Sequence, residues 1–362
     1  MTKPLPAFLA LLSLACCANQ GSAKDAQPFA TAAKAQFDEP WAMTFLPGSG
    51  VPLTKMALIT EKPGRLWLVD TETGQKTAVT GVPVVADGGQ GGFGDVVADP
   101  GYAGNQRVWL SWVEAGDGGF GAVVGRAQLV LGDGKPRLDG LTIIWRQDKT
   151  SGRGHFGHRL AFAADGSLFI SSGERQKFTP AQDPASNLGK IIRIGAGGSP
   201  ETWSLGHRNP LGLAFDGKGQ LWNTEMGPQG GDELNRVTKA ANYGYPKVSN
   251  GSHYGGRDIP DHAPGDGFEA PKLWWNPSIS PSSLMIYSGT LFPQWQGDGF
   301  IGALSGQALI RVDLDGDKAR KAEQWDMEER IREVEQGPDG AIWVLEDGGQ
   351  GRLLKLTPQT RK

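Results

Sequence analysis

A short segment in the middle of the chain combines residue types that could move a proton. Residues 154–160 read Gly-His-Phe-Gly-His-Arg-Leu and hold two of the five histidines in the sequence. Because the pKa of a histidine lies near neutrality, His155 in such a loop could act as a general base. A hydrogen-bonded packing histidine explains the same pattern. A metal site with His158 lacks a third ligand at convincing spacing.

Two further segments carry arginines that could hold an anion. Residues 205–210 read Leu-Gly-His-Arg-Asn-Pro, in which an Arg208 fork followed by the Asn209 amide suits a carboxylate-bearing ligand. Arg330 and Arg332 lie two residues apart, and on a strand such residues face the same side. A loop salt bridge and a solvated strand face remain open alternatives when each segment is taken alone.

A third pattern suits a hard cation. Gly227-Pro228 forms a corner that exposes backbone carbonyls, and Asp232-Glu233 follows shortly after it. Calcium takes carbonyl and carboxylate oxygens, although a turn with ordinary surface acids has the same sequence pattern. The glycine-rich residues 89–95 lack the Lys-Ser/Thr ending of a phosphate loop.

The elements that must position these residues repeat along the chain. Six times a turn with Gly or Asp precedes an alternating apolar and aromatic strand, starting at residues 64, 106, 166, 219, 298 and 340. The intervals of 42 to 79 residues compare with about 40–50 residues for a four-stranded propeller blade, so the longer ones imply inserted loops. The pattern predicts an all-β, six-bladed β-propeller with four-stranded antiparallel blades, with a β-sandwich as the alternative. Loops at one end of such a ring converge on its axis and can form a pocket.

The N-terminal segment predicts export. Lys3, an apolar stretch over residues 6–18 and the small residues 21–23 fit a signal peptide of residues 1–23, which is too short to span a membrane. The mature domain would then be residues 24–362, periplasmic and free of cysteine, because Cys16 and Cys17 both lie in the leader. A lipoprotein anchor at either cysteine is the alternative.

Charge and cysteine content limit the partners. The net charge of −3 comes from interspersed charges of both signs, which argues against a nucleic-acid partner. No haem-attachment motif is present, so a redox enzyme of this sequence would pass its electrons to a separate acceptor. We expect a monomer or a homodimer.

Taken in order along the chain, these segments resemble the soluble PQQ-dependent aldose dehydrogenases of the glucose/sorbosone type. The resemblance runs from about residue 40 to residue 355. Its most specific stretch covers residues 205–215 and continues through 225–228, 232–233 and 242–246. The resemblance implies oxidation of the anomeric C–OH of an aldose to a lactone, with hydride transfer to calcium-bound PQQ.

The resemblance also implies a role for individual positions. It makes His155 the general base. The implied cofactor contacts are Gln90, Arg208, Asn209, Arg330 and Arg332. The implied calcium ligands are the Gly227 and Pro228 carbonyls for a catalytic ion, and Glu233 and Tyr243 for a structural one. An arginine-rich site suits PQQ because this cofactor carries three carboxylates.

Three positions depart from the family pattern. Ser305 stands where better-known members carry a cofactor-binding lysine, and Arg175 stands where one of them has an amide. Gly154 replaces an aspartate that precedes the base in some members. Arg175 could compensate for Ser305 only if both reach the same carboxylate of the cofactor.

Two other functional classes stay open at this stage. One is a non-catalytic propeller that binds a carbohydrate or a protein. The other is a calcium-dependent lactonase-type hydrolase, a class in which several acidic side chains usually surround an axial calcium. The arginine, histidine and amide residues singled out above favour an anionic cofactor instead.

Overall fold

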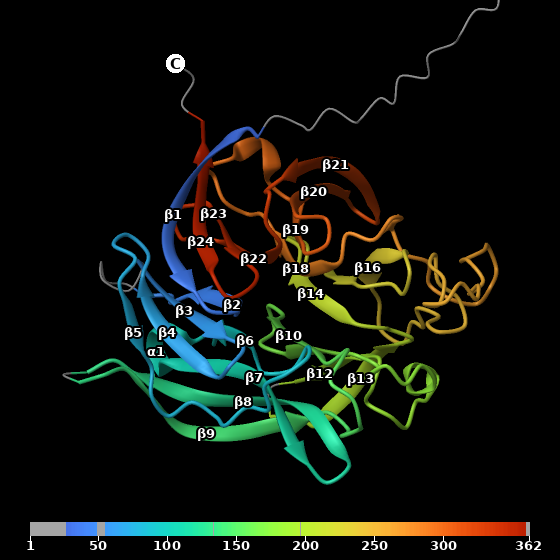
Figure 1. Ribbon diagram of the computed structural model, residues 1–362, viewed down its shortest axis with the longest axis horizontal. Helices are drawn as coiled ribbons and strands as arrows, with labels where there is room; N and C mark the ends of the chain where they lie inside the picture. The colour runs from blue at the N-terminus through green and yellow to red at the C-terminus, as the bar shows by residue number, and fades with distance from the viewer. Residues whose placement is uncertain (1–26, 49–54, 133, 196, 360–362) are drawn as a thin grey trace, which may run out of the picture.

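The protein is a ring of six antiparallel sheets. The structure, a computed structural model, describes residues 27–48, 55–132, 134–195 and 197–359. The predicted signal peptide therefore lies outside the described residues. In the described part of the chain each of six sheets has four strands, and they are arranged around a common centre (Figure 1). The predicted six-bladed propeller is confirmed.

Each blade runs outward from an innermost strand. Blade 1 comprises β2 (Pro40–Phe45), β3 (Met56–Glu61), β4 (Arg65–Asp70) and β5 (Lys76–Ala78); blade 2 comprises β6 (Phe93–Ala98), β7 (Arg107–Gly116), β8 (Gly119–Val130) and β9 (Arg137–Arg146); blade 3 comprises β10 (Gly157–Phe162), β11 (Leu168–Ser172), β12 (Lys190–Ile194) and β13 (Pro200–Leu205). Blade 4 comprises β14 (Pro210–Phe215), β15 (Leu221–Glu225), β16 (Asp232–Val237) and β17 (Leu273–Trp275); blade 5 comprises β18 (Pro281–Ile286), β19 (Gly299–Ala303), β20 (Ala308–Asp315) and β21 (Lys318–Asp326); blade 6 comprises β22 (Ile331–Gln336), β23 (Ile342–Glu346), β24 (Gly351–Pro358) and β1 (Phe29–Phe37). Short helical turns are α1 (Tyr102–Asn105), η2 (Thr179–Gln182) and η3 (Pro293–Trp295).

The two ends of the chain close the ring. Strand β1 pairs antiparallel with β24, from Phe29 opposite Pro358 to Phe37 opposite Gly351, so the N-terminal strand completes the last blade (Figure 1). The innermost strands contact one another around the ring, which leaves only short edges exposed. Over the described residues no helix has the length and apolar character needed to cross a membrane.

The repeated strand pattern corresponds to one position in the blade. Five of the six copies fall on the second strand of their blade, namely β7, β11, β15, β19 and β23. The first copy instead falls on β4, the third strand of blade 1. The longest interval between copies contains the connection 238–272 between β16 and β17, which has no strand of its own. This is the inserted loop that the spacing predicts.

One arginine on the axis contacts all six blades. Arg159, in β10, is 5% exposed. Its guanidinium lies 4.1 Å from the centre of the Trp41 ring in β2 and 3.5 Å from the carboxylate of Asp95 in β6. It donates hydrogen bonds to the other three innermost strands, at the carboxylate of Glu333 and the carbonyls of Leu211 (2.7 Å) and Ser282 (2.8 Å). The positions of the six blades are thus tied to a single side chain.

Three acidic side chains lie close to this arginine. Asp95, Glu333 and Glu335 line a cavity of about 90 Å³ together with Arg159. Burial raises the pKa of Glu333 to about 7 despite the Arg159 charge. Burial and the nearby Glu333 raise the pKa of Glu335 well above its usual value, and no described residue donates a hydrogen bond to its carboxylate. Ionising this acid therefore disfavours the folded state.

The change Glu335→Gln tests that cost. A carboxyl whose folded pKa is raised stabilises the fold below its unfolded pKa of about 4.3, and this stability is lost as the pH rises through the folded value. We therefore expect the substitution to increase the free energy of unfolding by about 1–3 kcal/mol at pH 8 and to leave it nearly unchanged at pH 4. Urea unfolding at both pH values measures the effect, with the exposed Glu329→Gln as the control. An equal effect at both pH values would contradict the assignment.

Candidate active site

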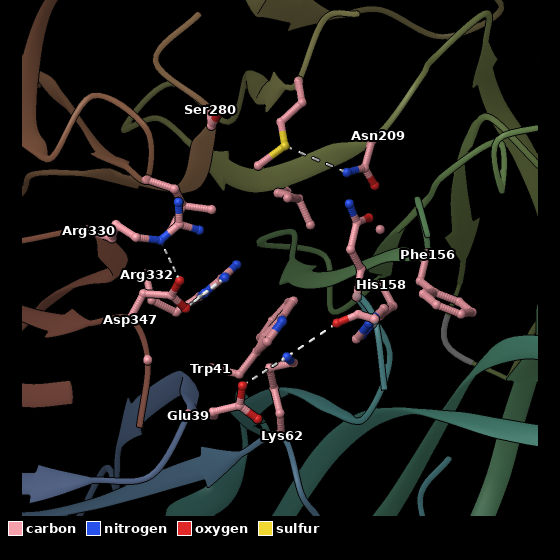
Figure 2. A pocket seen from close by; sticks show the side chains of 17 residues that line it. Glu39, Trp41, Lys62, Phe156, His158, Asn209, Ser280, Arg330, Arg332 and Asp347 are labelled. Carbon is pink, nitrogen blue, oxygen red and sulfur yellow. Dashed lines mark hydrogen bonds and ion pairs between the residues drawn. The ribbon is translucent and has the colours of Figure 1, made fainter. Parts of the chain in front are cut away.

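Two cavities lie where the loops at one end of the ring meet. The loops that enter an innermost strand and those that leave a second strand share this end, because the two strands are antiparallel. The central cavity, about 340 Å³, is lined by residues from Trp41 of blade 1 round to Asp347 beside blade 6 (Figure 2). The side cavity, about 240 Å³, lies beside blades 3 and 4 and includes His155 and residues of the 238–272 connection.

The two cavities share a wall. Three segments each place one residue in the side cavity and a near neighbour in the central cavity: His155 with Phe156, Arg208 with Asn209, and Pro228 with Met226. The two cavities are therefore adjacent, with these segments between them. All three segments contain residues that were predicted to form the site, and the fold brings them together.

His155 is held in one orientation by an acid. Its Nδ1 lies 2.5 Å from Oε1 of Glu174, whose Oε2 accepts the backbone amides of Lys177 and Phe178. Burial lowers the pKa of His155, the hydrogen bond to Glu174 opposes this, and the charge of Arg208 adds to the lowering. His155 is therefore neutral near pH 7, with its proton on Nδ1 facing Glu174. No described residue bonds its Nε2, which leaves that lone pair free.

The backbone at His155 is fixed as firmly as its ring. Its φ of 49° lies in the left-handed region that residues other than glycine rarely adopt. Its amide donates to Oε1 of Gln90 at 2.7 Å, and its carbonyl accepts from the Arg175 amide at 3.2 Å. Gln90 lines the central cavity, and its amide nitrogen has no acceptor among the described residues.

Basic side chains of the central cavity face its acids. Asp347 accepts hydrogen bonds from Nε of Arg330 at 2.8 Å and of Arg332 at 2.9 Å (Figure 2). Burial opposes ionisation of Asp347, but the two arginines hold its pKa below the usual range. Lys62 lies 3.6 Å from Glu39 and donates to the Gly89 carbonyl at 3.3 Å. The two predicted arginines do converge on one anion, which in this structure is a carboxylate of the protein itself.

Arg208 and Asn209 leave buried polar atoms without partners. Arg208 donates from Nη1 to the Met226 carbonyl at 2.9 Å, but its buried Nε has no acceptor. The Oδ1 of Asn209 is buried and accepts no hydrogen bond. Unpaired buried groups of this kind are costly unless a ligand or water satisfies them.

The Gly-Pro corner presents free carbonyls. No described residue donates a hydrogen bond to the carbonyl oxygens of Gly227 or Pro228. The corner is held from behind, where the Gly227 amide donates to Oδ1 of Asp232 at 2.8 Å. There is no space for a side chain at Gly227, because an added Cβ would lie 2.3 Å from the carbonyl oxygens of Gly230 and Gly231.

Glu233 forms a buried acid pair with Glu225, and Tyr243 packs against the histidine that bonds Glu225. The amide of Asn235 donates to both Glu225 (3.1 Å) and Glu233 (3.0 Å), and its own Oδ1 has no partner. Burial and the Glu225 charge raise the pKa of Glu233 well above its usual value. The ring of Tyr243 stacks on His207, the histidine that bonds Glu225, at 4.5 Å between ring centres.

Arg175 and Ser305 lie apart and share no partner. Arg175 is fully buried, and its three guanidinium nitrogens donate to the carbonyls of Gly152, Gly154 and Phe120. Its guanidinium lies 3.7 Å from the centre of the Phe156 ring. Ser305 bonds Ser280 and the Ser278 carbonyl. In this structure Arg175 supports the loop that carries His155, and neither residue lines the central or the side cavity.

The sequence analysis did not identify Glu174, Asp347 or Lys62 as site residues. Acids recur where the second strand of a blade ends, and Glu174, Asp347 and Glu225 all occupy that place. This recurrence could have pointed to them. It could not have shown which arginine or histidine each acid meets, because those partners belong to other segments. In the sequence, Glu174 and Asp347 look like ordinary acids that follow a strand.

Comparison with known proteins gives the chain its relatives. The family model described as Glucose / Sorbosone dehydrogenase matches residues 37–355. Aldose sugar dehydrogenase YliI of Escherichia coli (strain K12) is 38% identical over 346 residues, which cover 90% of this chain and 91% of the relative. Two solved structures share the fold. The apo-form of the soluble aldose sugar dehydrogenase from Escherichia coli has a TM-score of 0.85 and 36% identity, covering 91% of this chain and all of that one. The PQQ-bound form of aldose sugar dehydrogenase from Streptomyces coelicolor has a TM-score of 0.76 and 26% identity, covering 92% and 99%.

The change Glu174→Gln tests the electrostatic pairing in the site. Since the carboxylate of Glu174 raises the pKa of His155 against burial, removing its charge should lower that pKa further. An NMR titration of the His155 ring in both proteins measures the change. The substitution Glu201→Gln, on the outer strand β13, should leave the titration unaltered. A His155 pKa that stays the same or rises in Glu174→Gln would contradict the arrangement.

Proposed function

Because the chain belongs to the glucose/sorbosone dehydrogenase family, we propose that it oxidises the anomeric C–OH of an aldose to a lactone with PQQ and calcium. The predicted family and enzyme class are confirmed by the comparisons. The proposed chemistry rests mainly on the position of His155. This neutral histidine has a free Nε2 and lines the side cavity, which is adjacent to the central cavity with its arginines and lysine. A purely carbohydrate-binding propeller would not need such a base, and a lactonase-type site would not need the arginines.

The first step assigned to the protein is proton removal. The sugar would lie in the side cavity with its anomeric hydroxyl at Nε2 of His155. Glu174 holds the ring so that Nε2 accepts the proton, and its carboxylate stabilises the imidazolium that forms. Gln90 and Arg175 fix the backbone of His155 and so keep the base in place.

The central cavity fits an anionic cofactor such as PQQ. Arg330, Arg332 and Lys62 supply three cations, and the unpaired Nε of Arg208 and Oδ1 of Asn209 lie at the wall toward the base. The free amide nitrogen of Gln90 would complete these contacts. PQQ, when bound, accepts the hydride from the anomeric carbon. We assign no cofactor contact to Arg175 or Ser305, since their hydrogen bonds go to the protein.

The Gly227-Pro228 corner fits the proposed catalytic calcium. Its two free carbonyls are oxygen ligands of the kind that calcium prefers, and the rear contact with Asp232 keeps them in position. We propose that Glu233 and the Tyr243 segment hold a structural calcium. A cation there would relieve the repulsion between Glu233 and Glu225 and satisfy the unpaired Asn235 oxygen.

Reconstitution tests the proposed activity directly. Protein loaded with PQQ and calcium should reduce an artificial dye when aldoses are added. In His155→Ala we expect kcat to fall by about 100- to 10,000-fold, the usual contribution of a general base, while PQQ binding stays within about twofold. Loss of PQQ binding together with kcat would indicate a structural role for His155. Retention of a tenth or more of kcat would assign the base elsewhere.

The arginine pair should control cofactor affinity. We expect Arg330→Gln to weaken PQQ binding by about 10- to 100-fold, because a charge-assisted hydrogen bond is lost. Arg332 remains to pair with Asp347, so the fold should be preserved. A PQQ titration followed by quenching of tryptophan fluorescence measures the affinity. Arg320→Gln on the outer strand β21 removes an equal charge and should have no effect; equal affinities in all three proteins would refute the placement.

A further inference from the structure

The side cavity is lined by two arginines together with amide, imidazole and phenol groups. Its polar lining includes the side chains of Arg208, Arg257, His253 and Gln176. The one carboxylate in the lining, Glu174, is fully buried and already accepts three hydrogen bonds, from His155 and two backbone amides. The two guanidinium groups can only donate, so they match a ligand group that only accepts, such as a carboxylate or phosphate, better than a hydroxyl.

The two arginines of the side cavity have no acidic partner among the described residues. Arg208 donates to the Met226 carbonyl, and its guanidinium lies 5.8 Å from the centres of both the Tyr245 and Tyr254 rings. Arg257, in the connection 238–272, forms no ion pair with a described residue. Its neighbour Asp258 accepts a hydrogen bond from Ser252 and is not part of the lining. The lining therefore carries two arginine charges against the single carboxylate of Glu174, which leaves a net positive charge in the cavity.

Exposed aromatic rings lie at the same cavity. Tyr254 is 73% exposed and Phe178 is 44% exposed, two of only six large hydrophobic side chains among the described residues that are exposed. Both line the side cavity, together with Arg257. Aromatic rings pack against the apolar face of a sugar ring, and here they flank an arginine. The combination predicts a sugar ring that carries a negative charge.

We propose that the side cavity selects aldoses with an anionic group remote from the anomeric carbon, and that Arg257 binds this group. The inference rests on the proposed function, since it places the anomeric hydroxyl at His155. A hexuronate carboxylate or a sugar phosphate supplies the same chemistry, a compact anion that matches the guanidinium fork. Arg208 lies at the wall toward the cofactor, so Arg257 is the arginine left to determine substrate choice.

Substrate competition tests the proposal. The PQQ- and calcium-loaded protein is assayed for dye reduction with D-glucose, D-glucuronate and D-glucose 6-phosphate. We expect kcat/KM for at least one of the anionic sugars to exceed that for glucose by about tenfold and to fall as ionic strength rises. The two anionic sugars distinguish a carboxylate from a phosphate preference. Arg257→Gln should abolish the preference for the anionic sugar over glucose.

Controls separate this inference from the proposed function. Arg320→Gln should retain the preference, and Arg257→Lys should retain part of it because the charge remains. Calorimetric titration with each anionic sugar reports binding independently of turnover. If glucose is oxidised but neither anionic sugar is preferred or bound more tightly, the inference is wrong and the proposed function stands. If no sugar is oxidised, the proposed function fails. The inference is then decided by calorimetry: it holds if Arg257→Gln loses binding of the anionic sugar while Arg320→Gln keeps it, and it is wrong if both variants bind equally.

Discussion

The arrangement of the six blades depends on the contacts of one buried cation. Arg159 reaches the innermost strand of every blade through a ring contact, two carboxylates and two carbonyls. A buried arginine requires such partners, since an unpaired charge in the interior is very costly. Trp41 covers the guanidinium and lines the central cavity above it. The same set of contacts that positions the strands therefore also forms the floor of the candidate active site.

The loops at this end of the ring form two separate cavities, the central cavity and the side cavity. Neighbouring residues on three segments line different cavities, so His155 and Arg208 lie in the side cavity while Asn209 lines the central cavity. His158 lies close to His155 in the sequence but has different surroundings. Its ring stacks on Trp41 at 5.0 Å, its Nδ1 bonds Ser111, and burial lowers its pKa to about 3. Two histidines three residues apart thus have different environments: His155 pairs with Glu174 and leaves Nε2 free, whereas His158 is a buried packing group.

Acids of the protein itself balance the basic site. Asp347 pairs with both predicted arginines, and Glu39 lies near Lys62. These pairs keep the guanidinium groups oriented toward the central cavity, so an incoming anionic cofactor would exchange partners rather than reorganise the loops. The side cavity differs, because neither of its two arginines forms an ion pair with a described residue and Glu174 is its one lining acid. The proposed preference for an anionic sugar rests on this difference.

The sequence by itself determined the architecture and the order of the motifs. Periodic strands are local patterns, so the six blades could be predicted, and the ordered motifs around His155, Arg208 and Gly227 identified the family. It could not determine that β1 completes blade 6, or that the first copy lies on a third strand, because pairing joins distant segments. Only the tertiary structure paired His155 with Glu174 and directed Arg175 toward loop carbonyls. Those outcomes depend on which loops meet at the axis, and no local pattern in the chain specifies that.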